Sequence, residues 1–231
     1  MEKYADYISK IEIPQLWTGH KHIVWKLAPD VNVLSGVNGI GKSTILHRIV
    51  SGVKSVSAED DEIHIDVVPE DATLVRFDLI STPDVRSEYD INLNSLLERY
   101  DGYEHDPEKQ TILFDLIDRL FCATGKAVLR DKKGFLMQQY SMPLQTHLLS
   151  SGEKQMLCIL LTVYMEGGKP TVLFMDEPEV SLHMEWQQQL IATILKLNPK
   201  VQLILTTHSP AIIMHGWMDK VTEVTDITVE D

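Results

Sequence analysis

The residues of this chain that could do chemistry begin with a glycine-rich stretch, Gly36-Val37-Asn38-Gly39-Ile40-Gly41-Lys42-Ser43-Thr44. The stretch matches G-x-x-x-x-G-K-[ST] and lies between a strand-like run and a helix-like run. Glycines let the backbone fold tightly round a polyphosphate and aim its N–H groups at it, while the following helix directs its positive dipole end at the same anion. The alternative, an ordinary glycine-rich turn, does not account for this context on both sides.

The predicted ligand is therefore a nucleoside triphosphate with Mg²⁺. Lys42 would neutralise the β and γ phosphates, and Ser43 would bind Mg²⁺ through its hydroxyl. The candidate binding residues within the stretch are Gly36, Asn38, Gly39, Gly41, Lys42, Ser43 and Thr44.

Two adjacent carboxylates follow an apolar run, in Thr171-Val172-Leu173-Phe174-Met175-Asp176-Glu177-Pro178. At the carboxyl edge of a sheet, Asp176 could hold Mg²⁺ or its waters. Glu177 could lie beside the γ-phosphate and polarise or deprotonate the attacking water, as a general base does. The alternative is a plain Asp-Glu-Pro turn that ends a strand.

A histidine follows a second apolar run, "VQLILTT", in His208-Ser209-Pro210. A lone histidine is usually an ordinary surface or core residue. Here it comes at the end of a second predicted parallel strand, on the edge where ligands of such folds bind. A neutral imidazole at that place could hydrogen-bond the γ-phosphate or the attacking water.

The stretch "LLSSGEKQ", residues 148–155, opens an apolar helix with two hydroxyls and a glycine. One interpretation is a helix cap, in which Ser150 or Ser151 caps the helix and Glu153 or Lys154 lies in its first turn. Small residues with exposed N–H groups at a helix start are also suited to an anion.

Length and composition favour one large α/β domain, residues 1–231, over two small ones. The chain is 44% hydrophobic and 24% charged, and its net charge is −13, so direct nucleic-acid binding is uncertain and not the first expectation. No apolar run is long enough to cross a bilayer and the first residues lack the apolar core of a signal peptide, which predicts a cytoplasmic protein without membrane insertion. Cys122 and Cys158 fall in apolar helical patterns and are expected to be buried free thiols.

The elements that must position these residues follow from periodicity. Strands are expected within 9–35, then a helix closed by Gly52, strand-like runs at 62–68 and 72–80, two amphipathic helices within 84–125, and a hairpin over 126–140 with its turn at 132–134. A helix at about 152–166, a strand at 171–175, a helix at 183–197 and a strand at 201–207 come next, and the tail 220–231 is expected to form a last hairpin. Apolar strands separated by helices indicate a parallel sheet buried on both faces.

The motifs GxxGxGKST, LSSGE, DEP, EVSLH and TTHSP occur in this order between about Ile11 and Pro210. In this respect the chain resembles the ATP-binding-cassette (ABC) ATPases, above all the soluble branch with RecF, SMC and OLD-type proteins and related small stand-alone ATPases. The resemblance implies an α/β P-loop NTPase fold with a mostly parallel sheet, an N-terminal antiparallel β layer and a helical subdomain, about 84–166, inserted in the core.

The resemblance also implies site roles and partners. Ser151 and Gly152, with Ser150 beside them, would contact a γ-phosphate held by another subunit. Residues 179–183 match the D-loop at the dimer interface, and His208 matches the switch histidine. The implied activity is Mg²⁺-dependent ATP hydrolysis by a homodimer formed on ATP binding, which regulates a separate soluble effector, by analogy a nuclease or toxin in bacterial defence or DNA maintenance.

The main alternative is the ATPase subunit of a membrane transporter. Transporter cassettes carry a glutamine after the strand that precedes the helical insertion, and "VRFDLISTPDVRSEYD" has none. Asp78 and Ser81 are the remaining candidates for that Mg²⁺ contact, and Trp17 or Trp25 for an adenine-stacking aromatic. A nucleotide-gated scaffold without hydrolysis would not need Glu177, and a P-loop kinase would not explain the signature and histidine together.

Overall fold

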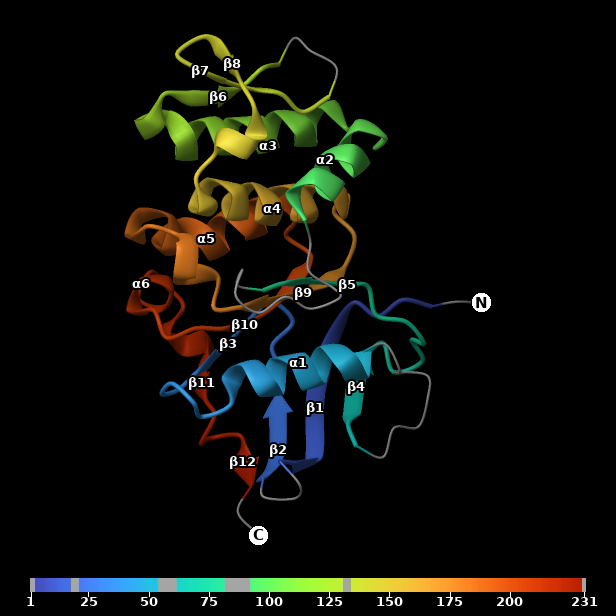
Figure 1. Ribbon diagram of the computed structural model, residues 1–231. Helices are drawn as coiled ribbons and strands as arrows, with labels where there is room; N and C mark the ends of the chain where they lie inside the picture. Colours follow the sequence, from blue (N-terminus) through green and yellow to red (C-terminus); the bar gives the residue numbers. More distant parts are fainter. Residues whose placement is uncertain (1–2, 18–20, 54–61, 82–91, 131–133, 230–231) are drawn as a thin grey trace.

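The computed structural model of the protein describes residues 3–17, 21–53, 62–81, 92–130 and 134–229. The elements form stacked layers (Figure 1), with an antiparallel sheet at one end, a helix and a parallel sheet in the middle, and helices with a small second antiparallel sheet at the other end. Among the described residues, no helix combines the length and the apolar character that crossing a membrane requires.

The central sheet is entirely parallel, with strand order β11-β3-β10-β9-β5. Its strands are β3 (Val31–Ser35), β5 (Phe77–Ile80), β9 (Thr171–Asp176), β10 (Val201–Thr206) and β11 (Val221–Glu223). Every residue of β9 and β10 is buried, because helices cover one face and α1 (Lys42–Val53) with the antiparallel sheet covers the other. The predicted parallel sheet buried on both faces is confirmed.

The antiparallel layer has strand order β12-β2-β1-β4 and packs on α1 (Figure 1). It consists of β1 (Tyr7–Leu16), β2 (Lys21–Lys26), β4 (His64–Val68) and β12 (Thr228–Val229). The helix expected to close at Gly52 includes this glycine, which is buried. A Cβ at Gly52 would lie 2.6 Å from the Ile63 side chain, so the glycine is needed for close packing rather than for ending the helix.

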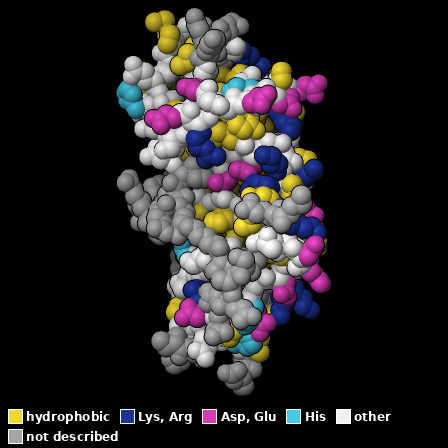
Figure 2. Space-filling view, turned by 90° about the vertical axis from the view of Figure 1, so that its right-hand side faces the viewer, with side chains coloured by type: hydrophobic (Ala, Val, Ile, Leu, Met, Phe, Trp, Pro, Cys, Tyr) yellow, Lys and Arg dark blue, Asp and Glu magenta, His cyan; other side chains and the backbone are white. Residues whose placement is uncertain are grey.

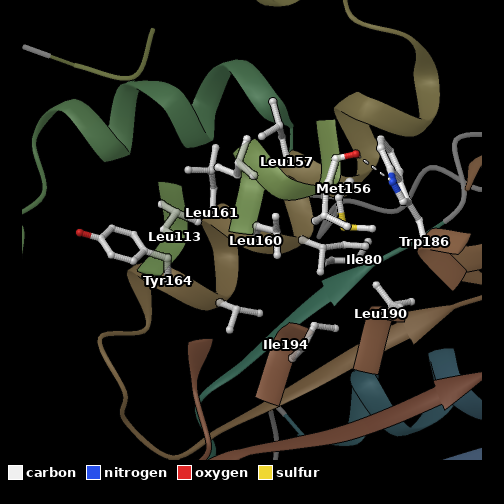
Figure 3. Close-up of a cluster of buried hydrophobic side chains, with 14 of the residues drawn as sticks. Ile80, Leu113, Met156, Leu157, Leu160, Leu161, Tyr164, Trp186, Leu190 and Ile194 are labelled. Carbon is white, nitrogen blue, oxygen red and sulfur yellow. Dashed lines mark hydrogen bonds between the residues drawn. The ribbon is translucent and has the colours of Figure 1, made fainter. Parts of the chain in front are cut away.

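The other side of the central sheet is helical. Its helices are α2 (Leu93–Asp101), α3 (Pro107–Phe121), α4 (Ser151–Met165), α5 (Met184–Leu197) and the short α6 (Pro210–Ile213), with 3₁₀ turns η1 (Cys122–Thr124), η2 (Thr146–Leu148), η3 (Pro178–Ser181) and η4 (Met218–Lys220). The two predicted amphipathic helices are α2 and α3, and residues 84–91 of the predicted segment lie outside the described residues. The core here is built on α4, which is buried almost all round (Figure 3).

The predicted hairpin over 126–140 is part of a sheet of three strands: β6 (Lys126–Val128), β7 (Met137–Gln139) and β8 (Met142–Leu144). Its predicted turn falls largely outside the described residues. The strand β8 was not expected, because a proline stands in it and only three residues form it. Tyr140 and Ser141 form the turn before β8, both with positive φ.

Two further expectations are wrong. The tail does not fold into a hairpin, since β11 pairs parallel with β3 in the central sheet and β12 pairs antiparallel with β2 in the other sheet. The tail thus links the two sheets. Cys122 is exposed and Cys158 is half-buried, although both are free thiols as predicted. Burial raises the pKa of the Cys158 thiol to about 12.

Gln202 joins the two sheets by side-chain hydrogen bonds. It lies in β10 and is fully buried. Its Oε1 accepts from the Ile8 N–H at 2.8 Å, and its Nε2 donates to the carbonyls of Ile8 and Ala28, both at 2.8 Å. The side chain thus satisfies backbone groups of the antiparallel layer that are out of reach of water.

We expect Gln202→Leu to lower the free energy of unfolding by about 2–4 kcal/mol, because it leaves buried backbone donors and acceptors without partners. Urea denaturation followed by circular dichroism measures this change. The matched control is Gln189→Leu on the exposed face of α5, expected within about 0.5 kcal/mol of wild type. Equal stability of the two variants would contradict the structural role of Gln202.

Asp78, one of the candidates for a Mg²⁺ contact, lies in β5 on the side of the sheet that faces α4 rather than at the strand end. Burial, together with the charge of Glu166 and a hydrogen bond with it, raises the pKa of the Asp78 carboxyl to about 8, against a smaller opposing effect of Arg99. Glu166 caps the C-terminus of α4 and accepts from the Thr171 hydroxyl at 3.1 Å. The Asp78 carboxyl therefore holds its proton more strongly than usual, between the sheet and α4.

Because the pKa of Asp78 is raised on folding from 3.8 to about 8, the folded state holds an extra proton between these values, so stability falls as pH rises through this window. The free energy of unfolding of the wild type should fall between pH 5 and pH 8. We expect this fall to be smaller in Asp78→Asn by about 1–3 kcal/mol. Urea denaturation at several pH values measures this. The exposed Asp219→Asn should keep the wild-type slope, and an unchanged slope in Asp78→Asn would refute the raised pKa of Asp78.

Candidate nucleotide-binding site

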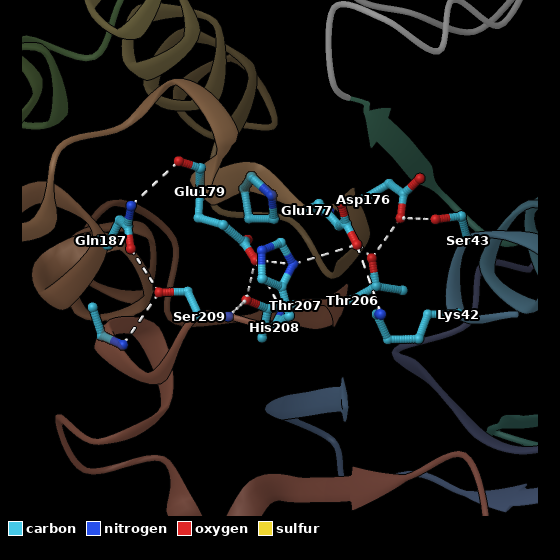
Figure 4. A network of polar contacts seen from close by, with 12 residues as sticks. Lys42, Ser43, Asp176, Glu177, Glu179, Gln187, Thr206, Thr207, His208 and Ser209 are labelled. Carbon is cyan, nitrogen blue, oxygen red and sulfur yellow. Dashed lines mark hydrogen bonds and ion pairs between the residues drawn. The ribbon is translucent and has the colours of Figure 1, made fainter. Parts of the chain in front are cut away.

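The strand register brings the predicted site residues to one edge of the central sheet. Thr206, the last residue of β10, pairs with Leu34 on one side and with Asp176 on the other. The carboxyl ends of β3, β10 and β9 are therefore level, and the glycine-rich loop, the carboxylates and the histidine all start from this edge (Figure 4).

The glycine-rich loop after β3 has the backbone that a phosphate-binding loop needs. Gly39 and Gly41 have φ values of 81° and 107°, which favour glycine. The Lys42 side chain is 4% exposed, and its Nζ donates to the Gly36 carbonyl at 3.0 Å and lies 3.7 Å from Glu177 Oε1. The buried ammonium is thus held over the loop by a carbonyl and a carboxylate.

A pocket of about 590 Å³ opens at this loop. Its lining comprises Trp17, Asn38, Gly39, Gly41, Lys42, Ser43, Thr44 and Glu177. Six of these eight residues come from the predicted phosphate-binding stretch, so the structure brings that stretch and Glu177 together round one cavity.

Asp176 is surrounded by donors. Its Oδ1 accepts from the Ser43 hydroxyl at 2.9 Å and from the Thr206 hydroxyl at 2.5 Å, and its Oδ2 lies 3.5 Å from His47 Nε2. Burial would raise the pKa of this carboxyl, but hydrogen bonds from His47, Thr206 and Ser43 hold it below its usual range. Asp176 is therefore ionised at neutral pH beside the Ser43 hydroxyl, where the sequence predicted a pair of Mg²⁺ ligands.

The donor set fits a magnesium ion that also binds nucleotide phosphates. A carboxylate and a hydroxyl are the usual protein ligands of such an ion. Among the described residues no group of three or more His, Cys, Asp or Glu side chains could hold a metal by itself. Ser81 follows β5, beside the end of β9. Its buried Oγ has no hydrogen-bond partner in the described part of the chain. An oxygen that could contact Mg²⁺ therefore lies at the strand end where transporter cassettes carry the glutamine.

Glu177 adopts an unusual backbone conformation for a residue with a side chain, with φ 45° and ψ 56°. Its N–H donates to Thr206 Oγ1 and to the Thr206 carbonyl, both at 3.1 Å, which fixes this turn against β10. Strain of this kind is tolerated where the surroundings hold the residue, and it commonly occurs at functional sites. The turn directs the Glu177 side chain into the pocket, 27% exposed.

His208 lies next to Glu177 and is about half exposed. Its Nδ1 is 3.5 Å from Glu177 Oε1 and 3.4 Å from Glu179 Oε1 (Figure 4). The histidine and the catalytic-base candidate therefore lie side by side, while the predicted contact of His208 with the γ-phosphate or the attacking water stays a prediction.

The start of α4 is a helix cap, as one interpretation of its sequence predicted. Ser150 Oγ accepts from the Glu153 N–H at 3.3 Å and Glu153 Oε2 accepts from the Ser150 N–H at 2.8 Å, a complete capping box. Burial would raise the pKa of Glu153, but Lys126, at 2.7 Å, and the Ser150 N–H hold it low. Ser150 and Ser151 remain exposed, and none of residues 150–152 lines the pocket of its own chain.

Of the two tryptophan candidates, only Trp17 lies at the pocket. A Cβ on Gly41 would come within 2.2 Å of the Trp17 ring, so the ring packs directly on the loop. Trp25 is 2% exposed and belongs to the core between α1 and the antiparallel sheet, which removes it as an adenine-stacking candidate.

Sequence reasoning missed two residues that complete the site, His47 and Thr206, and named Glu179 only as part of the D-loop match. His47 lies one helical turn after Ser43 in α1, and i,i+4 spacing from a metal-ligand candidate could have indicated it. Thr206 gave no such signal, because a threonine at a strand end is common, and the D-loop match did not indicate that Glu179 contacts the segment of His208.

Curated relatives found by sequence are ABC-type proteins. The chain is 40% identical over 76 residues to the "ABC-type organic anion transporter ABCA8B" of Mus musculus. This aligned segment covers 32% of this chain and 4% of the relative. It is 26% identical over 192 residues to "ABC transporter A family member 10" of Dictyostelium discoideum. This aligned segment covers 76% of this chain and 19% of the relative. The chain therefore spans only a small part of both.

Solved structures show the same fold. The SMC head domain from Thermotoga maritima aligns with a TM-score of 0.57 and 13% identity, over 94% of each chain. A putative ABC transporter ATP-binding protein from Pyrococcus furiosus aligns with a TM-score of 0.55 and 14% identity, over 96% of this chain and 100% of that one. The predicted α/β P-loop fold of the ABC type, with its antiparallel layer and helical insertion, is confirmed.

Residues 78–214, more than half of the chain, match the family AAA_21, described as "AAA domain, putative AbiEii toxin, Type IV TA system". The matched part contains the carboxylates, the serine-rich helix start and the histidine, and the phosphate-binding loop precedes it. This chain belongs to that family, and its fold is the one seen in the SMC head and ABC-type ATP-binding structures above.

Proposed function

We propose that this chain is an ATP-hydrolysing switch, in which two copies enclose two ATP molecules and separate after hydrolysis. The observation that carries the proposal is that one protomer has two separate sets of candidate phosphate-binding groups. Lys42, Ser43 and Glu177 surround one pocket, whereas Ser150 and Ser151 are exposed at a helix start outside it. Each serine pair is therefore available to an anion held by another copy.

Within one copy, each residue has a proposed task. Lys42 binds the β and γ phosphates, Ser43 and Asp176 hold Mg²⁺, and Trp17 packs on the base. Mg²⁺, when bound, neutralises charge on the phosphates. Glu177 orients the attacking water and accepts its proton, and His208 contacts the water or the γ-phosphate. Ser151 and Gly152 of the second copy complete the phosphate cradle.

The surface round the site supports the second copy as partner. Val37, Leu148 and Val180 are 72%, 62% and 53% exposed, and they stand in the glycine-rich loop, before the serine pair and after Glu177. Apolar side chains on three loops of one site favour an interface, because water would be excluded from them on association. ATP bridges the copies through its γ-phosphate, so ADP does not support the dimer.

The proposed effector is a separate soluble protein. The family description names a putative toxin of a type IV toxin–antitoxin system, which is in keeping with a role in bacterial defence or DNA maintenance. In the face shown in Figure 2, the described Lys and Arg side chains are interspersed with Asp and Glu rather than gathered, which does not favour nucleic acid as a direct partner there. We propose that residues 1–231 belong to one ATPase domain with the helical subdomain at about 84–166, and that the segment 84–125 is the surface that reports nucleotide state to a partner.

The second candidate is the ATPase subunit of a membrane transporter, which the names of the curated relatives favour. The strand end that would carry the coupling glutamine has Ser81 instead. Affinity purification of the chain from its native cells distinguishes the two. A membrane protein as the stable partner would support the transporter, and a soluble partner would support the switch.

We expect Glu177→Gln to stop hydrolysis and trap an ATP-bound dimer, because the amide cannot accept a proton while the phosphate contacts remain. Light scattering after size-exclusion chromatography with Mg²⁺ and ATP measures the mass. Wild type with ADP and the surface variant Glu185→Gln with ADP should stay monomeric. A monomeric Glu177→Gln protein in saturating ATP would refute the shared site.

We expect Ser151→Glu, added to Glu177→Gln, to abolish the dimer, because a carboxylate would face the γ-phosphate of the other copy. ATP binding to the monomer should change by less than about threefold, under 1 kcal/mol, since Ser151 does not line its own pocket. Calorimetry and light scattering measure the two quantities. Gln189→Glu adds the same charge on α5 and should leave the dimer intact, and loss of ATP affinity in the Ser151 variant would instead assign Ser151 to its own pocket.

A further inference from the structure

Glu179 is a buried carboxylate directly behind the proposed site. Its side chain is 5% exposed and it does not line the pocket, so it does not reach a bound nucleotide. Its Oε1 accepts from the Thr207 hydroxyl at 2.6 Å and from the His208 N–H at 3.0 Å (Figure 4). A buried charge is costly unless it is hydrogen-bonded, and here both donors belong to the segment that carries the histidine.

The imidazole of His208 also faces this carboxylate. Its Nδ1 lies 3.4 Å from Glu179 Oε1 and 3.5 Å from Glu177 Oε1. Ionised carboxylates only accept hydrogen bonds, so a ring nitrogen between two of them carries the proton. This arrangement selects the Nδ1–H tautomer and leaves Nε2 to meet a ligand.

A closed set of hydrogen bonds holds Glu179 itself. Gln187 Nε2 donates to the Glu179 carbonyl at 3.3 Å and to the Leu182 carbonyl at 2.7 Å, and Gln187 Oε1 accepts from Ser209 Oγ at 2.6 Å. The Ser209 N–H donates in turn to Thr207 Oγ1 at 2.9 Å. The turn after β9 and the end of β10 are thereby locked to each other, with Glu179 between them.

We infer that Glu179 is the positioning residue of His208, fixing both the backbone place and the tautomer of its ring for ATP hydrolysis. The effect on turnover rests on the proposed function, whereas the effect on the tautomer of His208 does not. A histidine held by a buried acid through one nitrogen acts through the other, and replacing such an acid by its amide inverts the tautomer without disturbing the fold.

The test is Glu179→Gln, which keeps the size of the side chain but removes its charge and replaces one acceptor oxygen by an NH₂ donor. We expect kcat for ATP to fall about 10- to 100-fold with KM changed less than about threefold, since substrate contacts remain. Glu185→Gln on the exposed start of α5 is the matched control and should keep wild-type kcat. Unchanged kcat in Glu179→Gln would overturn the inference.

A double-mutant cycle separates positioning from a general structural role. In a His208→Ala background, Glu179→Gln should lower kcat no further, because its effect passes through the ring. A further fall as large as in wild type would overturn the inference. Thermal unfolding of each variant accompanies the kinetics, and a cooperative transition is required for comparison.

A spectroscopic readout keeps the inference independent of turnover. In ¹⁵N-histidine NMR spectra, with the His208→Ala spectrum identifying the signal, we expect His208 to be the Nδ1–H tautomer in wild type and to lose that signature in Glu179→Gln. The same tautomer in both proteins would overturn the inference. If wild type hydrolyses no ATP, the proposed function fails, and the tautomer result alone decides the role of Glu179.

Discussion

The parallel pairing of β10 between β3 and β9 is the constraint on which the rest of the site depends. It sets Leu34, Thr206 and Asp176 level at the carboxyl edge, so that three loops leave the sheet at one place. Side chains alternate along a strand, and a shift of one residue would therefore turn Asp176 to the opposite face. The register is secured because both central strands are buried over their whole length, and any slip would expose apolar side chains or leave buried backbone groups unpaired.

The charges at this edge are unbalanced. Lys42 is the buried cation, and it faces Glu177, with Asp176 and Glu179 as further buried carboxylates nearby. Neutral donors, mainly hydroxyls and backbone N–H groups, offset the cost of burying the two acids. A site of this kind gains from a divalent cation, because the cation relieves carboxylate repulsion and at the same time brings a polyphosphate toward Lys42.

The sequence predicted those parts of the site whose chemistry is local. The glycine-rich loop requires glycines at particular φ values, and Asp176, Glu177 and His208 follow strands, so spacing alone located them. Contacts made between distant segments could not be predicted in this way. The burial of Trp25, the separation of β11 from β12 and the packing of Gly52 on Ile63 each depend on how two sheets close over α1. Cys122 was misjudged for a related reason, since the apolar pattern continues past Phe121, the buried last residue of α3, into the 3₁₀ turn η1, which has no buried residue.

The start of α4 is attached to the segment that follows Glu177 in the same protomer. A Cβ on Gly152 would lie 2.3 Å from the Ser181 carbonyl, and Gln155 Nε2 donates to the Pro178 carbonyl at 2.9 Å. The exposed serines therefore cannot move toward a ligand without moving η3 or breaking a buried hydrogen bond. Lys126 attaches the same helix start to the small sheet through Glu153. In the proposed dimer, the phosphate held by the second copy contacts the start of α4, which is packed against the turn that follows Glu177. A contact made in one site is therefore transmitted to Glu177 of the other site by packing rather than by a flexible loop.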